Sequence, residues 1–224
     1  VLTLMLVAAP FVVPESRDPH PGPFDVTSIL LSVATITPVV YGIKEVAKNG
    51  LTALAVATIA AGLLAGAAFV RRQLRRAEPM LDVRLFASPA FGGGVLVNLF
   101  SVVALTGFIY FVSQDLQLVV GLSPVDAGLA LLPGLLATIV AGLLVVKVVA
   151  HVSPGHVIAA CMSFAAVGYA ILALAGGAGT LWPVVVGFVF LAVGAGAAET
   201  VSNDLILSSA PAGRAGAASA ISET

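Results

Sequence analysis

Six long runs of apolar residues follow one another along the chain, and each is almost free of charged side chains. The runs cover Phe24–Ile43, in which Asp25 is the one charged residue, and then Leu51–Val70, Gly92–Ser113, Ala127–Val146, Val157–Ala175 and Leu181–Ala198. A helix rises about 1.5 Å per residue, so each run crosses most or all of a hydrocarbon core of about 30 Å. The runs lack the alternation of a membrane β-barrel strand. The pattern therefore predicts an all-α, polytopic transmembrane helical bundle.

The amino-acid composition supports the same class of protein. Apolar residues make up 59% of the chain and charged residues 9%, and the mean hydropathy is +1.11. About a quarter of the residues of a soluble domain are charged, so a soluble protein is not expected. The net charge of −1 gives no indication of nucleic-acid binding. We therefore expect a multi-pass protein of the cell membrane, with the lipid bilayer as a partner and no nucleic acid.

Both ends of the chain fall inside apolar segments. The chain opens within the apolar run Val1–Val13 and closes at Thr224, a few residues into a helix-like segment. We expect an internal fragment of a longer protein, so the missing remainder is a predicted partner and the bundle is incomplete. The predicted organisation is the end of a transmembrane helix over 1–13, a cytoplasmic connector over 14–23, a pair of transmembrane helices over 24–70, a basic cytoplasmic connector over 71–91 and a partial C-terminal transmembrane bundle over 92–224.

Lys and Arg residues fall between the apolar runs in alternation. Eight of the ten lie in connectors that share one side of the membrane, and Lys44 and Lys48 lie on the other side. Cytoplasmic loops are enriched in Lys and Arg, so the eight mark the cytoplasmic side. The cluster Arg71–Arg76 is interpreted as a topology and lipid anchor rather than a substrate site. The next stretch, Met80–Phe86, is either a short interfacial helix or a solvated loop.

Proline and small residues mark special positions within the runs. Pro38 and Pro133 lie inside predicted helices, and we expect each to kink its helix because proline removes one backbone hydrogen bond. Broken helices often line the cavities of transporters. Three pairs of small residues four apart predict close helix packing: Gly62 with Gly66, Ala137 with Ala141, and Gly194 with Ala198.

Three acidic residues late in the chain, Glu199, Asp204 and Glu223, lie at or near membrane depth. Glu199 and Asn203 are four residues apart and share a helix face, whereas Asp204 points elsewhere. Glu223 lies in the last helix-like segment, after Arg214. An acid balanced between desolvation and a nearby cation can trade a proton for a cationic ligand. The alternative is a structural acid that pairs with Arg214 or caps a helix, and both interpretations stay open for all three acids.

The sequence contains no motif typical of a metal site or of a catalytic site. His20, His151 and His156 lie in connectors, without a Cys/His cluster or an HExxH motif, so no metal site is expected. There is also no phosphate-binding loop of the GxxxxGKS type and no Ser/His/Asp arrangement. We therefore predict no catalytic residues and no enzyme activity.

Several short motifs occur in a fixed order over nearly the whole chain. They are Val13–Pro19, Glu78–Phe86, Leu116–Pro124 with Ala127–Leu129 and Leu131–Pro133, Ser208–Pro211, Arg214–Gly216 and Ser219–Thr224. In residues and spacing they resemble the fourteen-helix drug:proton antiporters of the major facilitator superfamily. The resemblance implies that the chain runs from the end of helix six to the start of helix thirteen. The pair of helices over 24–70 would then be the one inserted between two six-helix halves.

The resemblance also implies a function and a site. It implies proton-coupled efflux of amphipathic or cationic drug-like compounds, with the proton gradient as energy source and no cofactor. The family often places an acid at the position of Glu223, where it is implicated in proton coupling or cation recognition. Some members carry a further acid shortly after the Leu-Leu-Pro motif, but Gly134–Ala141 contains none. Asp115 also departs from the family pattern, which has an aromatic residue there.

Two alternative functions remain at this point. One is an exporter of the same fold for an endogenous metabolite, peptide or lipid, and the other is a transport-inactive membrane receptor or scaffold. For proton coupling and substrate binding we rank Glu223 first, and Glu199, Asp204 and Asn203 after it.

Overall fold

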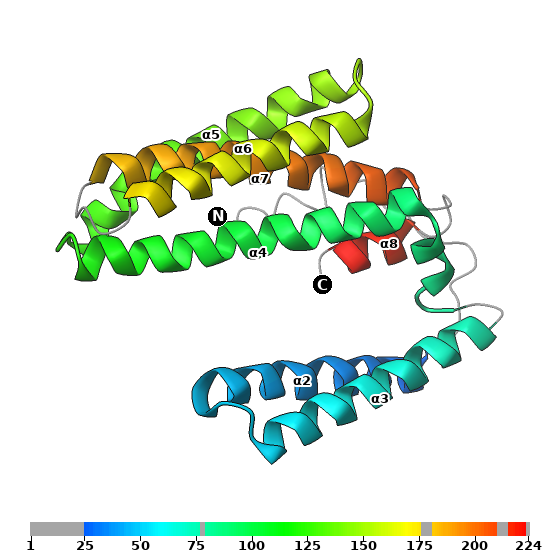
Figure 1. Ribbon diagram of the computed structural model, residues 1–224. Coiled ribbons are helices and arrows are strands. Elements are labelled where there is room, and N and C mark those ends of the chain that lie inside the picture. Colours follow the sequence, from blue (N-terminus) through cyan, green and yellow to red (C-terminus); the bar gives the residue numbers. More distant parts are fainter. Residues whose placement is uncertain (1–24, 77–78, 176–180, 210–214, 223–224) are drawn as a thin grey trace, which may run out of the picture. The chain divides into compact units, whose positions relative to one another are not determined.

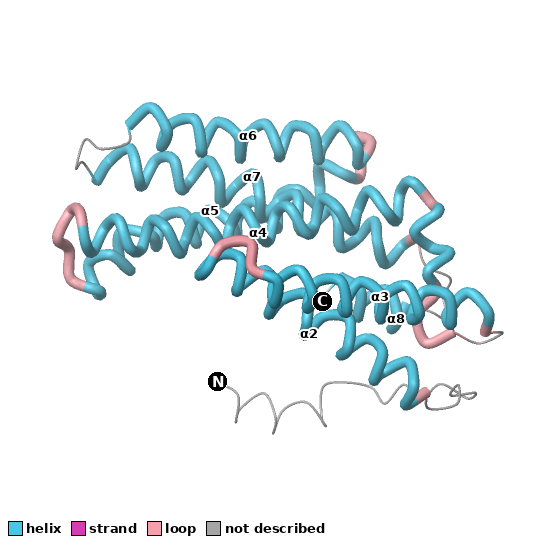
Figure 2. The backbone as a smooth tube through the Cα atoms, turned by 60° about the horizontal axis from the view of Figure 1, so that its bottom comes forward, coloured by secondary structure: helices cyan, strands magenta, loops and turns pink. Residues whose placement is uncertain are grey.

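The computed structural model describes residues 25–76, 79–175, 181–209 and 215–222, and every regular element within these ranges is helical (Figures 1 and 2). The helices are α2 (Val26–Asn49), α3 (Ala53–Arg75), the short 3-10 helix η1 (Val83–Ala87), α4 (Pro89–Leu118), α5 (Pro124–Val149), α6 (Pro154–Ala175), α7 (Leu181–Ser208) and α8 (Ala215–Ser222). Helices α2 to α7 are long and apolar enough to cross a membrane. Each predicted apolar run falls on one of them, so the all-α transmembrane architecture is confirmed.

Several helix ends differ from the ends of the apolar runs. Helix α3 continues through Arg75 and α4 begins at Pro89, so both extend into the basic connector predicted over 71–91. Arginine is a good helix former, and its long side chain lets the charge reach the headgroups, so the helix need not stop where the apolar run stops. Within that connector, the predicted alternatives for Met80–Phe86 were a helix or a loop, and a helix forms at Val83–Ala87.

Local sequence accounts for where the helices start and stop. Ser123 caps α5 by accepting a hydrogen bond from the Asp126 backbone N–H at 3.2 Å, and Pro124 occupies the first helical position. Thr52 caps α3 in the same way. Gly50 ends α2 at a φ of 76°, a left-handed conformation that glycine adopts without strain.

The chain divides into two compact units, Val1–Met80 and Leu81–Thr224. In the first, α2 and α3 form a hairpin whose helices approach closely through glycine. A side-chain carbon at Gly62 would lie 2.8 Å from the backbone oxygen of Thr35, and one at Gly42 would lie 3.0 Å from that of Ala55. Gly66 faces Thr35 as well. The pair Gly62 and Gly66 therefore lies at a helix contact, as predicted.

The second unit is built around α7, which packs against α4, α5 and α6. In the most apolar stretch of α7, 56% of the residues are buried, whereas α4 has 22% and α5 and α6 have 17% each. The rings of Phe108 on α4 and Phe188 on α7 stack with centroids 5.1 Å apart. Leu116, Leu131 and Leu191 belong to the same core. Helix α7 is therefore the centre of this unit.

Glycines again set the closest approaches. Gly194 of α7 lies against the backbone of Cys161 and Ala165 on α6, so no side chain fits between the two helices there. Gly168 and Gly187 face each other in the same interface, where a side-chain carbon at Gly168 would lie 2.6 Å from the Gly187 oxygen.

The other predicted special positions are found in the described helices. Ala198 is fully buried, and Ala141 packs against a small cluster that includes Val145 and Ala197. Pro38 lies inside α2 and Pro133 inside α5, and the predicted kinks at these two prolines remain predictions.

We expect Gly194→Ala to lower the thermal stability of the purified protein, because the added carbon overlaps the α6 backbone. Overpacking of this kind costs about 1–3 kcal/mol. The melting temperature is read from circular dichroism at 222 nm in detergent. Gly128→Ala is the matched control, since no atom lies within 4 Å of the added carbon and alanine favours a helix. Equal melting temperatures for the two variants would contradict the close α6–α7 contact.

Candidate functional site

The interface between α4 and α7 can be followed residue by residue, and the two helices run in opposite directions. Gly94 of α4 lies against Ile206 of α7, and Phe108 lies against Phe188. Between these contacts, the Asn98 side-chain amide donates a hydrogen bond to Oδ1 of Asn203 at 3.0 Å. Residue numbers thus rise on α4 as they fall on α7.

Asn98 and Asn203 bring polar groups into an otherwise apolar contact. Asn98 is buried and Asn203 is half-buried. A side-chain amide that is removed from water needs a hydrogen-bond partner, and each residue supplies one for the other. Of the two, only Asn203 was predicted from the sequence as a site residue, so its partner on α4 was missed.

Two further polar residues lie about one turn away along this interface. Ser101 follows Asn98 by three residues on α4, and Glu199 precedes Asn203 by four on α7. Because the helices are antiparallel, Ser101 and Glu199 are displaced from the Asn98–Asn203 pair in the same direction along the helix axes. The two residues therefore lie at about the same height along the interface. We call Asn98, Ser101, Glu199 and Asn203 the polar band.

Ser101 is the unusual member of the polar band. Its side chain is only 1% exposed, and its Oγ has no hydrogen-bond partner within the part of the chain that the structure describes. Leaving a buried hydroxyl unsatisfied costs about 1–3 kcal/mol, so such a group is suited to a water or a ligand. Glu199 is half-buried at the same level. The band therefore offers a carboxylate, a hydroxyl and two amides within an apolar bundle.

Of the other two predicted acids, the structure describes Asp204 alone. Asp204 is exposed, although Asn203 beside it is half-buried, so the two side chains meet different surroundings. Glu223 and Arg214 lie outside the described residues, and so does His20. The pairing of an acid with Arg214 and the first rank given to Glu223 remain predictions.

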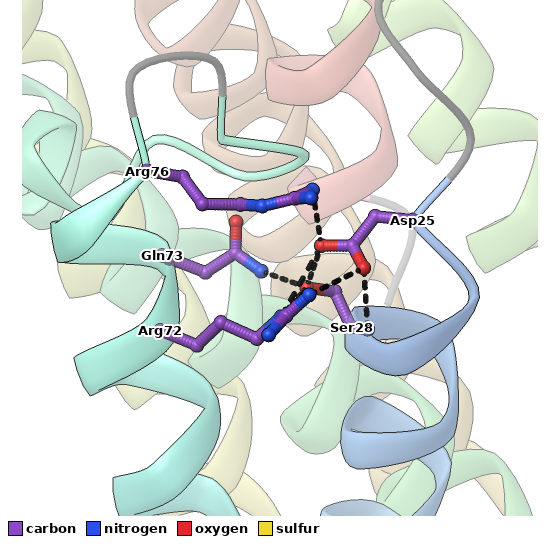
Figure 3. A network of polar contacts seen from close by, with 5 residues as sticks. All are labelled: Asp25, Ser28, Arg72, Gln73 and Arg76. Atoms are coloured by element: carbon purple, nitrogen blue, oxygen red, sulfur yellow. Dashed lines mark hydrogen bonds and ion pairs between the residues drawn. The ribbon is translucent and has the colours of Figure 1, made fainter.

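A second polar cluster closes one end of the α2–α3 hairpin (Figure 3). Asp25 caps α2, accepting hydrogen bonds from the backbone N–H and the hydroxyl of Ser28. From α3, an N–H of Arg72 donates to Oδ1 of Asp25 at 3.0 Å, and Arg76 forms an ion pair with Oδ2 at 2.6 Å. Gln73 donates to the Ser28 hydroxyl at 2.8 Å. We call these five residues the Asp25 clamp.

The charge on Asp25 is strongly stabilised by its partners. The hydrogen bond from Arg72 and the one from Ser28 hold the pKa of this carboxyl well below its usual range, against the opposing effect of burial. Asp25, Ser28 and Gln73 are buried, while the two arginines are about one-third exposed. The clamp therefore holds a permanent ion pair, which suits a structural role and not proton exchange.

From the sequence, Asp25 stood out only as the charged residue in the first apolar run. The signal that was overlooked is local: an acid followed three residues later by Ser28, at the start of an apolar run, is typical of a helix cap. Its pairing with Arg72 and Arg76 joins residues about fifty positions apart, and no local pattern predicts it.

An apolar pocket of about 460 Å³ lies in the second unit between α5, α6 and α7. Its walls include Val145, Cys161, Phe164 and Ala197, and His156 is its one ionisable side chain apart from the thiol of Cys161. His156 is exposed in the first turn of α6. The pocket lacks an acid, so it is not suited to holding a cation. Among the described residues no three His, Cys, Asp or Glu side chains come together as metal ligands.

Comparison with known proteins now identifies the family. The chain is 48% identical over its whole length to the multidrug efflux pump LfrA of Mycolicibacterium smegmatis. It is 29% identical, over 99% of its length, to the methyl viologen resistance protein SmvA of Salmonella typhimurium. It is 30% identical, over 61% of its length, to the MFS-type transporter YhcA of Bacillus subtilis. The chain belongs to the major facilitator superfamily.

This assignment agrees with the resemblance in the sequence and with a multi-pass membrane protein. No family model matches the chain. The chain spans 44% of the length of LfrA, 45% of SmvA and 26% of YhcA, so this major facilitator chain corresponds to less than half of each relative.

We expect Asn98→Ala and Asn203→Ala to be energetically coupled. Interhelical hydrogen bonds between side chains in membrane proteins contribute about 0.6 kcal/mol on average and up to about 1.7 kcal/mol. A double-mutant cycle on the unfolding free energy in detergent measures the coupling. Asn98→Ala combined with Ser163→Ala is the control cycle, because Ser163 bonds within α6. Equal, additive results in both cycles would contradict the bond between α4 and α7.

We expect Asp25→Asn to lower the melting temperature at pH 7. The folded pKa of Asp25 is depressed, so its stabilisation is complete above the ordinary pKa of about 4 and is lost as the pH falls below that value. The difference between wild type and variant should therefore narrow below about pH 4. Asp115→Asn, at an exposed acid on α4, is the control. A difference that stays constant down to low pH would contradict the ionised clamp.

Proposed function

We propose that the whole protein containing this chain exports amphipathic and cationic drug-like compounds across the cell membrane in exchange for protons. The observation that carries the proposal is the half-buried Glu199 in the polar band of an apolar bundle. An intramembrane acid usually faces a cavity or a partner and marks the path of a substrate or proton. The names of LfrA, a multidrug efflux pump, and SmvA, a methyl viologen resistance protein, support the same function.

The polar band gives this exchange a physical basis. An ionised Glu199 attracts a cation, and a protonated Glu199 does not, so the two ligands compete for one group. The bond between Asn98 and Asn203 fixes α7 against α4 one turn away. The Ser101 hydroxyl supplies a donor for the carboxylate or for the ligand. The apolar side chains around the band hold the hydrophobic part of an amphipathic compound.

The remaining parts of the proposal extend beyond the described residues. The remainder of the whole protein supplies the opposite wall of the cavity, and rocking of one bundle against the other gives alternating access. Glu223 is a second proton-coupling acid, as the family resemblance implies, and Asp204 has a lesser role because it is exposed. The proton gradient is the energy source, no cofactor takes part, and the protein is not an enzyme.

We expect Glu199→Gln in the whole protein to abolish proton-driven export of a fluorescent cation while leaving membrane insertion intact. Glutamine keeps the size and hydrogen bonding of the acid but fixes the neutral form. The measurement is dye accumulation in inverted membrane vesicles with an imposed proton gradient. Asp204→Asn is the matched control and should retain export. Glu223→Gln, tested alongside, should also lose it.

Three results would count against the proposal. Wild-type export by both Glu199→Gln and Glu223→Gln would show that neither acid couples export to protons. Export that does not depend on the proton gradient would show that this gradient is not the energy source. A protein that moves no compound in a panel of cations, while it inserts and folds normally, would favour the receptor or scaffold alternative.

A further inference from the structure

The arginines at the end of α3 fall into two pairs with different surroundings. Arg72 and Arg76 are held by Asp25 in the clamp. Arg71 and Arg75 are four residues apart on another face of the helix, and both are exposed. Neither has an ion-pair partner within the residues that the structure describes. Asp25 thus neutralises only part of the cluster, and two guanidinium groups are left facing outward.

Arg71 and Arg75 stand at one end of an apolar groove on the hairpin. The groove has a volume of about 700 Å³ and runs over α3, with Thr35 of α2 as its side wall. Its apolar lining includes Leu63, Ala67, Val70 and Leu74. Gly66 keeps the groove open at its centre, where the methyl group of Thr35 would lie 3.0 Å from any added side-chain carbon.

The length of the groove matches one leaflet of a bilayer. From Leu63 to Arg75 the helix rises about 18 Å at 1.5 Å per residue. Half of a hydrocarbon core of about 30 Å is about 15 Å. The groove therefore accommodates an extended acyl chain, and its basic end falls at the depth of the headgroups.

We propose that this groove binds one anionic phospholipid, with the acyl chain along α3 and the phosphate on Arg71 and Arg75. We call it the lipid groove. The two positive charges repel the cationic compounds proposed as substrates, so the groove is distinct from the polar band. A soluble anion would contact the two arginines but would leave the apolar part of the groove unfilled. Basic side chains at the cytoplasmic surface are attracted to anionic lipids.

The Asp25 clamp contributes to the lipid groove by fixing its geometry. It ties the last turn of α3 to the first turn of α2, so Arg71 and Arg75 project from a rigid end of the hairpin. Arg72 and Arg76 are already engaged and cannot turn toward the lipid without losing Asp25. The lipid site is therefore specific to one face of α3.

The test titrates phosphatidylglycerol and phosphatidylcholine with identical acyl chains into the purified full-length chain in neutral detergent, with bound lipid counted by native mass spectrometry. We expect one phosphatidylglycerol to bind about tenfold or more tightly than phosphatidylcholine. Arg71→Gln with Arg75→Gln should abolish this preference. Lys44→Gln with Lys48→Gln is the matched control, because it removes two exposed charges at the same spacing on α2, and it should keep the preference.

A second variant tests the apolar part of the site separately. Ala67→Trp fills the groove and leaves every charge in place, and we expect it to weaken phosphatidylglycerol binding about tenfold. Wild-type binding by the double arginine variant would overturn the proposal. Wild-type binding by Ala67→Trp, or displacement of the lipid by equimolar glycerol phosphate, would also overturn it, because the site would then recognise an anion without the acyl chain.

Discussion

Helices in a bilayer gain little from contact between apolar side chains, because acyl chains offer the same surroundings. What holds them together is close backbone approach and the hydrogen bonds that such approach allows. The second unit meets this constraint at α7. Gly187 and Gly194 let α6 reach the α7 backbone, and Gly134 accepts the ring of Phe188 from α7. Two of the described polar contacts between helices, Asn98 with Asn203 and Thr138 with Ala192, are made to α7.

The polar groups follow from that packing. Because α4 packs against α7 at Gly94, Asn98 and Asn203 are close enough to form a hydrogen bond. The same packing buries Ser101. Thr138 bridges to α7 as well, with its hydroxyl 3.3 Å from the Ala192 oxygen. The half-buried Glu199 thus lies on α7 between two interhelical hydrogen bonds, at Ala192 and at Asn203.

The sequence was sufficient to predict the transmembrane helices, and it also pointed to Glu199 and Asn203, two members of the candidate polar band. The signals are the apolar runs, small residues such as Gly62 and Gly194, and the intramembrane Glu199. Each of these signals is local in the sequence and has a direct physical cause. Pairings between distant helices could not be predicted in this way. Asn98 looked like a single polar residue in an apolar run until the register of α4 against α7 gave it Asn203 as a partner. The clamp likewise depends on how the hairpin folds, because Asp25 and Arg76 meet only when α2 and α3 are aligned.

The adjacent Pro133 and Gly134 make one turn of α5 different from the rest of the helix. Pro133 has no backbone N–H, so it cannot donate the usual helical hydrogen bond to the carbonyl of Leu129, one turn earlier. After this point, Thr138 ties α5 to the α7 backbone. Before it, α5 is held by side-chain packing such as that of Leu131, with the flat ring of Phe188 lying against the bare backbone of Gly134. The turn around Pro133 therefore lacks one backbone hydrogen bond, and we expect any bending of α5 to concentrate there, before the part of the helix that Thr138 joins to α7.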